Sequence, residues 1–271
     1  MDLGFTDKAA LVVGGSTGIG LATAEILLRE GARVTIAARR PDTLREAALA
    51  LECGTGRVPA LAVCDAADPA QVAALLARFD GAPLHVLVSA FGGSIRGSLE
   101  TLTDPQWLAN YELNLLGTVR VVRAALPLLR RAAGGARPGG ARPDGARIVL
   151  LGATSGRQPT EGQVASNVHK AGLLALTKTL SLELAADGIG VNSVSPGRAM
   201  TPRAVARAQQ MAAAEGLPLE AVYERVTRDI PLRRYGTAAE VAAMVAFLAS
   251  PVSAYTTGQN VLVDGGLYRG I

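Results

Sequence analysis

The chain has 271 residues, 49% of them hydrophobic, and a formal net charge of +4, which suits a single α/β domain over residues 1–271. The small charge excess is scattered, with no run of lysines and few aromatic residues, so we expect no nucleic-acid partner. The two cysteines, Cys53 and Cys64, are too few for a disulfide framework or a metal cluster, so we expect reduced thiols and no metal. Neither a signal peptide nor a stretch of about 18 consecutive apolar residues is recognisable, so we expect a cytoplasmic protein with no membrane partner.

Short apolar segments alternate with Ala- and Leu-rich helical segments along the chain. Seven of the apolar segments read as β-strands: 9–13, 34–38, 59–63, 85–88, 148–151, 191–194 and 260–263. They are continuously apolar, as parallel strands buried on both faces must be. With helices between six of them, the pattern predicts an α/β fold with a Rossmann-type, doubly wound, seven-stranded parallel sheet and helices on both faces.

A glycine-rich turn follows the first predicted strand and opens a helix. The candidate cofactor-binding residues in this turn are Gly14, Ser16, Thr17, Gly18, Ile19 and Gly20. Glycines permit a tight turn and a close approach of the backbone to a pyrophosphate, and the helix N-terminus offers free N–H groups to it. In this strand–turn–helix context the motif predicts a dinucleotide site.

Two arginines, Arg39 and Arg40, end the second predicted strand, where an NAD site carries an acid. Guanidinium groups bind phosphate in a bidentate manner, so we expect NADP, with its 2′-phosphate at this position; the alternative is a pair of ordinary surface charges. Asp65 and Ala66 follow the third strand. There Asp65 is a candidate acceptor for the adenine amino group, unless it caps the helix that starts near Pro69.

Two segments interrupt the alternating pattern. Residues 134–147 are rich in Gly, Pro and Arg and predict a flexible surface loop, for which docking of an acidic partner is a minor alternative. Residues 198–235 form a long connection after the sixth strand, and we expect a substrate lid rather than a solvated helical hairpin. Its arginines indicate a small-molecule substrate with an anionic group; they are Arg203, Arg207, Arg225, Arg228, Arg233 and Arg234.

A further helix is predicted from the spacing of Leu173, Leu176, Leu180 and Leu184. Ser166 and Lys170 precede these leucines and are four residues apart, so their side chains leave one face of the helix. Ala153, just after the fifth strand, precedes Ser166 by thirteen residues.

Four motifs carry a resemblance to a known family: the glycine-rich turn, Asn114 in Asn-Leu-Leu-Gly, Pro196-Gly197 followed by Thr201, and Val263-Asp264-Gly265-Gly266. Over essentially its whole length the sequence resembles the short-chain dehydrogenase/reductase family, and most closely its β-ketoacyl-carrier-protein reductase-like members. The resemblance implies that Asn114 is structural and catalytic, and that Pro196, Gly197 and Thr201 hold the nicotinamide carboxamide of the cofactor. It also implies a homotetramer.

Three departures from the family pattern affect chemistry. After the fourth strand the family has Asn-Asn-Ala-Gly, whereas this chain has Ser89-Ala90-Phe91-Gly92, so we expect the loss of a polar support; Ser89, Ala90 and Phe91 remain candidates for cofactor binding. The family's catalytic serine falls on Ala153 and its tyrosine on Ser166.

The resemblance implies a mechanism in which a tyrosine donates a proton to the carbonyl oxygen of the substrate while hydride arrives from the nicotinamide. A nearby lysine cation lowers the pKa of that tyrosine. Ala153 has no donor and Ser166 is a much weaker acid, so we assign catalysis to Asn114, Ser166 and Lys170, with Lys170 also holding the nicotinamide ribose. Neighbouring residues that could supply the proton instead are Thr154, Ser155 and Arg157. His169 lies about 100° around the helix from Lys170 and is expected to pack, and His85 is expected to be structural.

Two interpretations follow. One is an NADP-dependent reductase of a carbonyl-like substrate with an altered proton relay; it is preferred because the dinucleotide site is complete and only the acid is missing. The alternative is a nucleotide-binding protein without redox turnover, either a cyclase or isomerase or a regulatory protein.

Overall fold

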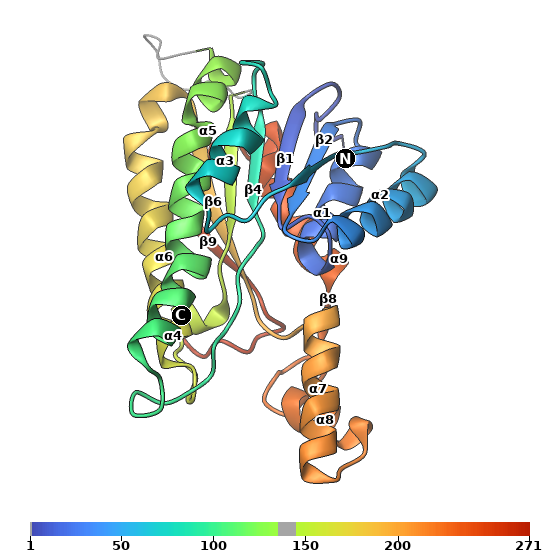
Figure 1. Cartoon of the computed structure of the whole chain (residues 1–271), viewed down its shortest axis with the longest axis vertical. Helices are drawn as coiled ribbons and strands as arrows, with labels where there is room; N and C mark the ends of the chain where they lie inside the picture. Colours follow the sequence, from blue (N-terminus) through green and yellow to red (C-terminus); the bar gives the residue numbers. More distant parts are fainter. Residues whose placement is uncertain (1, 135–144) are drawn as a thin grey trace.

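The computed structural model describes residues 2–134 and 145–271. At its centre is a seven-stranded sheet in the order β3-β2-β1-β4-β5-β6-β9, in which every neighbouring pair is parallel (Figure 1). The strands are β1 Ala9–Val13, β2 Arg33–Ala38, β3 Ala60–Val63, β4 Val86–Ser89, β5 Arg147–Leu151, β6 Gly190–Pro196 and β9 Asn260–Val263. Each overlaps one of the seven segments predicted from sequence, so the predicted sheet is confirmed.

Strand β1 is apolar along its whole length, because helices cover both faces of the sheet. Successive side chains of a strand point to opposite faces. In β1, Leu11 and Val13 therefore enter one core, while Ala10 and Val12 enter the other.

Helices α3, α5 and α6 lie on one face of the sheet, and α1, α2 and α9 lie on the other (Figure 1). Val121 of α5 and Leu173 of α6 belong to the first core, and Leu27 of α1 and Val245 of α9 to the second. The bounds are α1 Gly18–Arg29, α2 Pro41–Thr55, α3 Pro69–Ala77, α4 Asp104–Tyr111, α5 Gly117–Ala133, α6 Val164–Glu183 and α9 Ala238–Ala249. Within the described ranges, every helix is too short or too polar to cross a lipid bilayer.

Strand order reverses at β1, which has β2 on one side and β4 on the other. Connections leaving β1 and β4 therefore run to opposite faces of the sheet. In an open α/β sheet this is where a crevice forms at the carboxyl ends of the strands, and where ligands bind.

The connection between β6 and α9 carries two helices, α7 Pro202–Glu215 and α8 Leu219–Thr227, which extend beyond the edge of the sheet (Figure 1). Its two ends are joined by a short parallel pair that sequence reasoning missed, β7 Ala199–Met200 with β8 Gly236–Thr237. The predicted loop 134–147 lies outside the described residues, apart from Gly134 at the end of α5 and residues 145–147.

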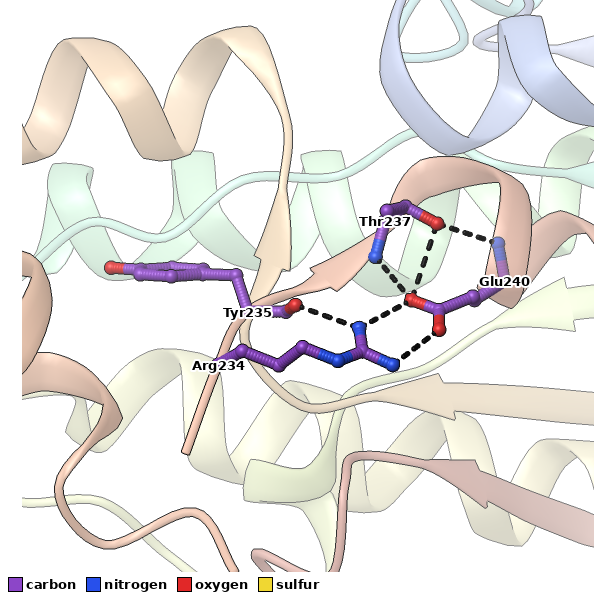
Figure 2. Close-up of polar contacts among 4 residues, drawn as sticks. All are labelled: Arg234, Tyr235, Thr237 and Glu240. Carbon is purple, nitrogen blue, oxygen red and sulfur yellow. Dashed lines mark hydrogen bonds and ion pairs between the residues drawn. The ribbon is translucent and has the colours of Figure 1, made fainter. Parts of the chain in front are cut away.

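The return of this connection into the sheet layers is fixed by a capping box at α9. Thr237 Oγ1 accepts from the Glu240 N–H at 3.1 Å, and Glu240 Oε2 accepts from the Thr237 N–H at 2.7 Å. Arg234 donates to both carboxylate oxygens of Glu240 at 2.9 and 2.6 Å (Figure 2). This cap satisfies N–H groups that a helix start leaves without an intrahelical acceptor.

Replacing Thr237 by Ala should lower the free energy of unfolding by about 1 kcal/mol, because the N-cap acceptor of α9 is lost. Thr237→Ser keeps the hydroxyl and should match the wild type within experimental error. Urea unfolding followed by circular dichroism measures both variants. Equal stability of Thr237→Ala and Thr237→Ser would show that the cap contributes nothing to stability.

Candidate functional site

The glycine-rich turn joins the carboxyl end of β1 to α1, and its glycines are required by space. Gly14 has a φ of +84°, and a Cβ on it would lie 2.7 Å from the carbonyl carbon of Ala90. A Cβ on Gly20 would lie 2.2 Å from the carbonyl oxygen of Gly14. Thr17 caps α1 with extended backbone and no side-chain hydrogen bond, which leaves the N–H groups of the first turn for an anionic ligand.

The side chains of this turn divide into two groups. Ser16 and Thr17 are accessible to solvent, whereas Ile19 is buried in the core between α1 and the sheet. Ile19 can therefore meet a ligand only through its backbone. A Cβ on Gly18 would lie 3.2 Å from Thr201 Cγ2, so the turn after β1 packs against the segment after β6.

Arg39 and Arg40 follow β2 at the same edge of the sheet. Both are exposed, and among the described residues neither side chain forms a salt bridge or a hydrogen bond. Two neighbouring, unpaired guanidinium groups are suited to binding a phosphate.

Asp65 follows β3, and it does not cap α3. Its Oδ1 accepts from the Ala67 N–H at 3.0 Å. The cap is Asp68, whose Oδ1 accepts from the N–H groups of Ala70 and Gln71 at 2.8 and 3.2 Å. The interpretation of Asp65 as the cap is therefore wrong, because Asp68 stands directly before the helix. Asp65 is half-buried, and its neighbour Ala66 is buried.

After β4 the structure differs from the expected loss of a polar support. The Ser89 hydroxyl is buried and lies 3.1 Å from the Thr118 hydroxyl of α5, so a polar link between strand and helix remains. Ala90 N–H donates to the carbonyl oxygen of Val13 at 2.8 Å and ties this turn to β1. Phe91 is half-buried and packs over Gly117.

Asn114 is held by a π-helical turn, Glu112–Leu116, between α4 and α5. Such turns occur frequently at functional sites because they re-aim a side chain. Asn114 Oδ1 accepts from the Gly93 N–H at 3.1 Å, and its Nδ2 donates to the backbone and side-chain oxygens of Asn110, both at 3.0 Å. The buried amide thus joins the helix to the loop after β4.

Lys170 lies in the middle of this site. Its side chain is 8% exposed, and its Nζ donates to the Leu151 carbonyl oxygen at the end of β5 at 3.2 Å. A Cβ on Gly92 would lie 2.9 Å from Asn114 Oδ1 and 3.2 Å from Lys170 Nζ, so the two side chains meet over this glycine. Burial lowers the pKa of Lys170 to about 8, and the Arg203 guanidinium adds to that effect.

Ser166, on which we expect the family's tyrosine position to fall, lies one turn before Lys170. Ser166 is 4% exposed, and among the described residues its hydroxyl has no hydrogen-bond partner. Ala153 is half-buried and has no donor. Two of the alternative donors are committed elsewhere: Thr154 Oγ1 donates to the Pro196 carbonyl oxygen at 3.0 Å, and Arg157 donates to the Asn260 carbonyl oxygen at 3.3 Å.

Ser155 is the remaining alternative donor, and it is half-buried beside these residues. Its hydroxyl makes no hydrogen bond within the described part of the chain. Among the candidate proton donors, Ser155 and Ser166 are therefore the two whose hydroxyls make no hydrogen bond within the described part of the chain.

His169 packs, as predicted. Its Nδ1 lies 2.9 Å from Asn110 Oδ1, and its ring contacts those of Trp107 and Tyr111 with centroid separations of 5.4 and 5.6 Å. Burial lowers the pKa of His169. Sequence reasoning missed Asn110, which connects His169 to Asn114; the available signal was the spacing of four between two asparagines on one helical stretch.

The segment after β6 completes the site. Pro196 accepts the Thr154 bond, and a Cβ on Gly197 would lie 2.7 Å from Asp264 Cβ. Thr201 Oγ1 accepts from the Ala204 N–H at 3.3 Å and so caps α7 beside the glycine-rich turn. The ends of β1, β4, β5 and β6 therefore bring the predicted residues to a single edge of the sheet.

Comparison with known proteins agrees with this geometry. Residues 13–268 match the family described as enoyl-(acyl carrier protein) reductase. The chain belongs to the short-chain dehydrogenase/reductase family. It is 36% identical to a Streptomyces coelicolor protein that carries a ketoacyl reductase name, covering 96% of this chain and 97% of that protein.

The fold of this chain is also similar to that of solved structures of the family. L-sorbose reductase from Gluconobacter frateurii, complexed with NADPH and L-sorbose, superposes with a TM-score of 0.92 at 29% identity and covers 100% of both chains. An NADPH-bound short-chain oxidoreductase from Pseudomonas aeruginosa, described as containing an atypical catalytic center, gives 0.85 at 33% identity, covering 98% of this chain and 100% of that one.

The buried lysine should cost stability. The pKa of Lys170 is about 8 in the folded protein, below the 10.5 of an ordinary lysine, so keeping it charged inside costs on the order of 3 kcal/mol. We expect Lys170→Met to raise the free energy of unfolding at pH 7 by that amount. Lys178→Met, an exposed position on the same helix, should change it little.

The pH dependence has a defined sign. Between about pH 8 and 10.5 the unfolded chain binds the proton that the folded protein has released, so wild-type stability gains from rising pH in this window. The advantage of Lys170→Met should shrink accordingly. Urea unfolding at pH 7 and pH 9.5 measures it, and an advantage that stays constant between these pH values would contradict the depressed pKa.

Proposed function

We propose that the protein is an NADP(H)-dependent oxidoreductase that reduces a carbonyl group on a small-molecule substrate. The observation that carries this proposal is the convergence of Lys170 and Asn114 over Gly92, at the same sheet edge as the glycine-rich turn. A nucleotide-binding protein without chemistry would have no need of a buried lysine with a lowered pKa there. Similar proteins with the same fold support the proposal, because two of them were solved with NADPH.

The residues fit the dinucleotide cofactor. Positive φ and the lack of space for a Cβ at Gly14 bring backbone close to where a pyrophosphate would lie, and the start of α1 supplies N–H groups. Arg39 and Arg40 would hold the 2′-phosphate, Asp65 the adenine, and Thr201 with Pro196 and Gly197 the carboxamide. When bound, the cofactor supplies the hydride.

The chain itself must supply a proton to the substrate oxygen. A donor works best with a pKa near the working pH. Lys170, with its pKa of about 8, meets that condition, whereas a lysine in water would hold its proton too tightly. We infer that the Lys170 ammonium delivers the proton and that the Ser166 hydroxyl passes it on. Asn114 holds the loop after β4 and so fixes the position of Lys170.

We also propose that residues 198–235 act as a substrate lid that controls access to this site. The pair β7–β8 fixes both ends of the segment. We further propose that the protein is a homotetramer. Three apolar side chains are exposed on the helices that would form its interfaces: Leu108 of α4, and Val168 and Leu182 of α6.

Cofactor preference tests the arginine pair. The wild type should bind NADPH at least about tenfold more tightly than NADH, because Arg39 and Arg40 face a doubly charged phosphate. Arg39→Asp should reverse the order. Arg57→Asp, an exposed arginine beyond the far end of α2, changes the net charge equally and should keep the preference. Isothermal titration gives the affinities, and a wild-type preference for NADH would refute the assignment.

Restoring the family's acid and its partner tests the proton route. Ser166→Tyr with Ala153→Ser should raise kcat by more than the product of the two single effects, since both groups act on one oxygen. General acid catalysis is worth about 10²–10⁴-fold. NADPH oxidation across an aldehyde and ketone panel measures it, and Ser166→Ala should lower the wild-type rate.

Two outcomes would count against the proposal. Wild-type protein that binds NADPH but transfers no hydride, with activity only in the double variant, would favour a non-redox protein. A folded, NADPH-binding double variant that reduces nothing would show that the pocket no longer accepts carbonyl substrates.

A further inference from the structure

Three buried polar side chains form a connected group next to the proposed proton donor. Asn110 lies near the end of α4, Asn114 in the π-helical turn that follows, and His169 on α6, directly before Lys170. Asn110 is 0% exposed, Asn114 1% and His169 4%. The catalytic residues assigned from the sequence include Asn114 and Lys170, but neither Asn110 nor His169. Contacts with backbone groups fix the direction of each hydrogen bond in this group.

The Asn114 carboxamide has one orientation that satisfies its backbone contacts. A backbone N–H only donates, so the atom that lies 3.1 Å from the Gly93 N–H must be the acceptor Oδ1. A backbone carbonyl only accepts, so the atom 3.0 Å from the Asn110 carbonyl oxygen must be the donor Nδ2. The same Oδ1 meets Lys170 Nζ over Gly92. The amide oxygen of Asn114 is therefore turned towards the lysine.

The orientation of Asn114 determines that of Asn110. Asn114 Nδ2 also lies 3.0 Å from the side chain of Asn110, and a donor there requires the Asn110 atom to be Oδ1. A turned Asn110 amide would place its NH₂ group against the NH₂ group of Asn114. In the observed orientation Asn110 Nδ2 is buried and pairs with no acceptor of the described chain. An unpaired buried N–H is unfavourable, so Asn110 needs other contacts to stay in this orientation.

His169 supplies such a contact, as a second donor to the Asn110 oxygen. Its Nδ1 lies 2.9 Å from Asn110 Oδ1, and because a carboxamide oxygen only accepts, Nδ1 must carry a hydrogen. Burial lowers the pKa of His169, so the ring is neutral at pH 7 and its Nε2 carries none. The rings of Trp107 and Tyr111 contact the imidazole and hold it in place. His169 is thus a fixed donor at the start of the chain of hydrogen bonds.

We propose that Asn110 and His169 are positioning residues, which keep the Asn114 oxygen turned towards Lys170. His169 fixes the amide of Asn110, and the oxygen of Asn110 takes the second N–H of Asn114. A carboxamide oxygen beside an ammonium group favours its charged, proton-carrying form. The expected effect on rate rests on the proposed reductase function, whereas the hydrogen-bond directions and the pKa of Lys170 can be measured without turnover.

The tautomers of the two histidines test the hydrogen-bond directions in the wild-type protein. The chain contains only His85 and His169. His85 Nδ1 accepts from the Ala9 N–H at 3.2 Å, so His85 carries its hydrogen on Nε2, and His169 should show the opposite pattern. Nitrogen NMR of protein with isotope-labelled histidine, at pH 8, distinguishes the two ring nitrogens by their protonation. One histidine of each kind is expected. Two histidines with the hydrogen on Nε2 would overturn the proposal, and this result needs no variant.

Two substitutions of His169 separate hydrogen bonding from packing. His169→Phe keeps a ring and loses the donor, whereas His169→Asn loses the ring and keeps an N–H near the position of Nδ1. We expect His169→Phe to lower kcat by about tenfold or more with little change in KM, and His169→Asn to recover part of that loss. A purely structural role predicts the reverse order. His85→Asn, a change just before the amino end of β4, should leave kcat unchanged.

Asn110→Leu removes the shared acceptor and should lower kcat as His169→Phe does. Because both residues act through Asn114, the double variant should be no slower than Asn110→Leu alone. The two effects multiplying in the double variant would show that they act independently and would contradict the proposed chain of hydrogen bonds.

The pKa of Lys170 is a readout that packing alone would not move. NMR of labelled lysine gives few signals to assign, because the chain has three lysines: Lys8, Lys170 and Lys178. His169→Phe and Asn110→Leu should each lower the pKa of Lys170 below its wild-type value of about 8, since the Asn114 oxygen is no longer held beside the ammonium group. The charge of Arg203, which also acts on Lys170, is the same in these variants.

The failure of this proposal is distinguishable from the failure of the reductase function. A Lys170 pKa that ignores both substitutions, or His169→Phe protein that is more active than His169→Asn, would overturn the positioning role even if the protein is a reductase. The expected tautomers and a lowered pKa in the variants, in a protein that oxidises no NADPH, would support the positioning role and defeat the reductase function instead.

Discussion

A parallel sheet covered by helices on both faces must be apolar along its strands, because alternate side chains enter two separate cores. In this chain Ala10 and Val12 occupy one core and Leu11 and Val13 the other. Side chains that are to meet a polar ligand are therefore best placed at the strand ends. Strand order reverses at β1, which is where open α/β sheets bind ligands. The glycine-rich turn follows β1 at the carboxyl edge, and Lys170 donates to the Leu151 carbonyl oxygen at the end of β5.

Burial gives Lys170 properties that the sequence alone does not show. The Leu151 carbonyl accepts one of its hydrogen bonds, and no carboxylate compensates its charge within the described part of the chain. A lysine in that setting releases its proton at a pH of about 8, which suits the proposed role of Lys170 as the proton donor. The same burial makes the site costly to fold, a common relation between function and stability.

Local sequence predicted the strands and the turn well because each depends on neighbours along the chain. Continuous apolar runs define buried strands, and Gly14 and Gly20 leave no space for a side chain. Contacts between distant residues were not predictable in this way. Nothing near Arg234 or Arg225 in the sequence shows that one pairs with Glu240 and the other with Glu215, and the β7–β8 pair joins segments separated by two helices.

The candidate site was predicted through residue types, and the structure adds how they are held. Asn114 owes its position to a π-helical turn and to Asn110, and Thr154 is committed to Pro196. The alternative role of Asp65 as a helix cap is wrong because a second aspartate, Asp68, stands closer to the helix start. Which of two nearby aspartates caps a helix is decided by backbone geometry, which the amino-acid sequence does not show directly.

Single-turnover oxidation of NADPH by the wild-type protein tests most directly whether the buried Lys170 supplies the proton in the proposed reaction. The protein is mixed with excess carbonyl compound, and the nicotinamide absorbance is followed from pH 6 to pH 10. We expect a rate that falls as pH rises through about 8, the pKa of Lys170, and that slows in deuterium oxide. A rate that stays constant across this range, or NADPH that binds fully and is never oxidised, would contradict the proposed proton route.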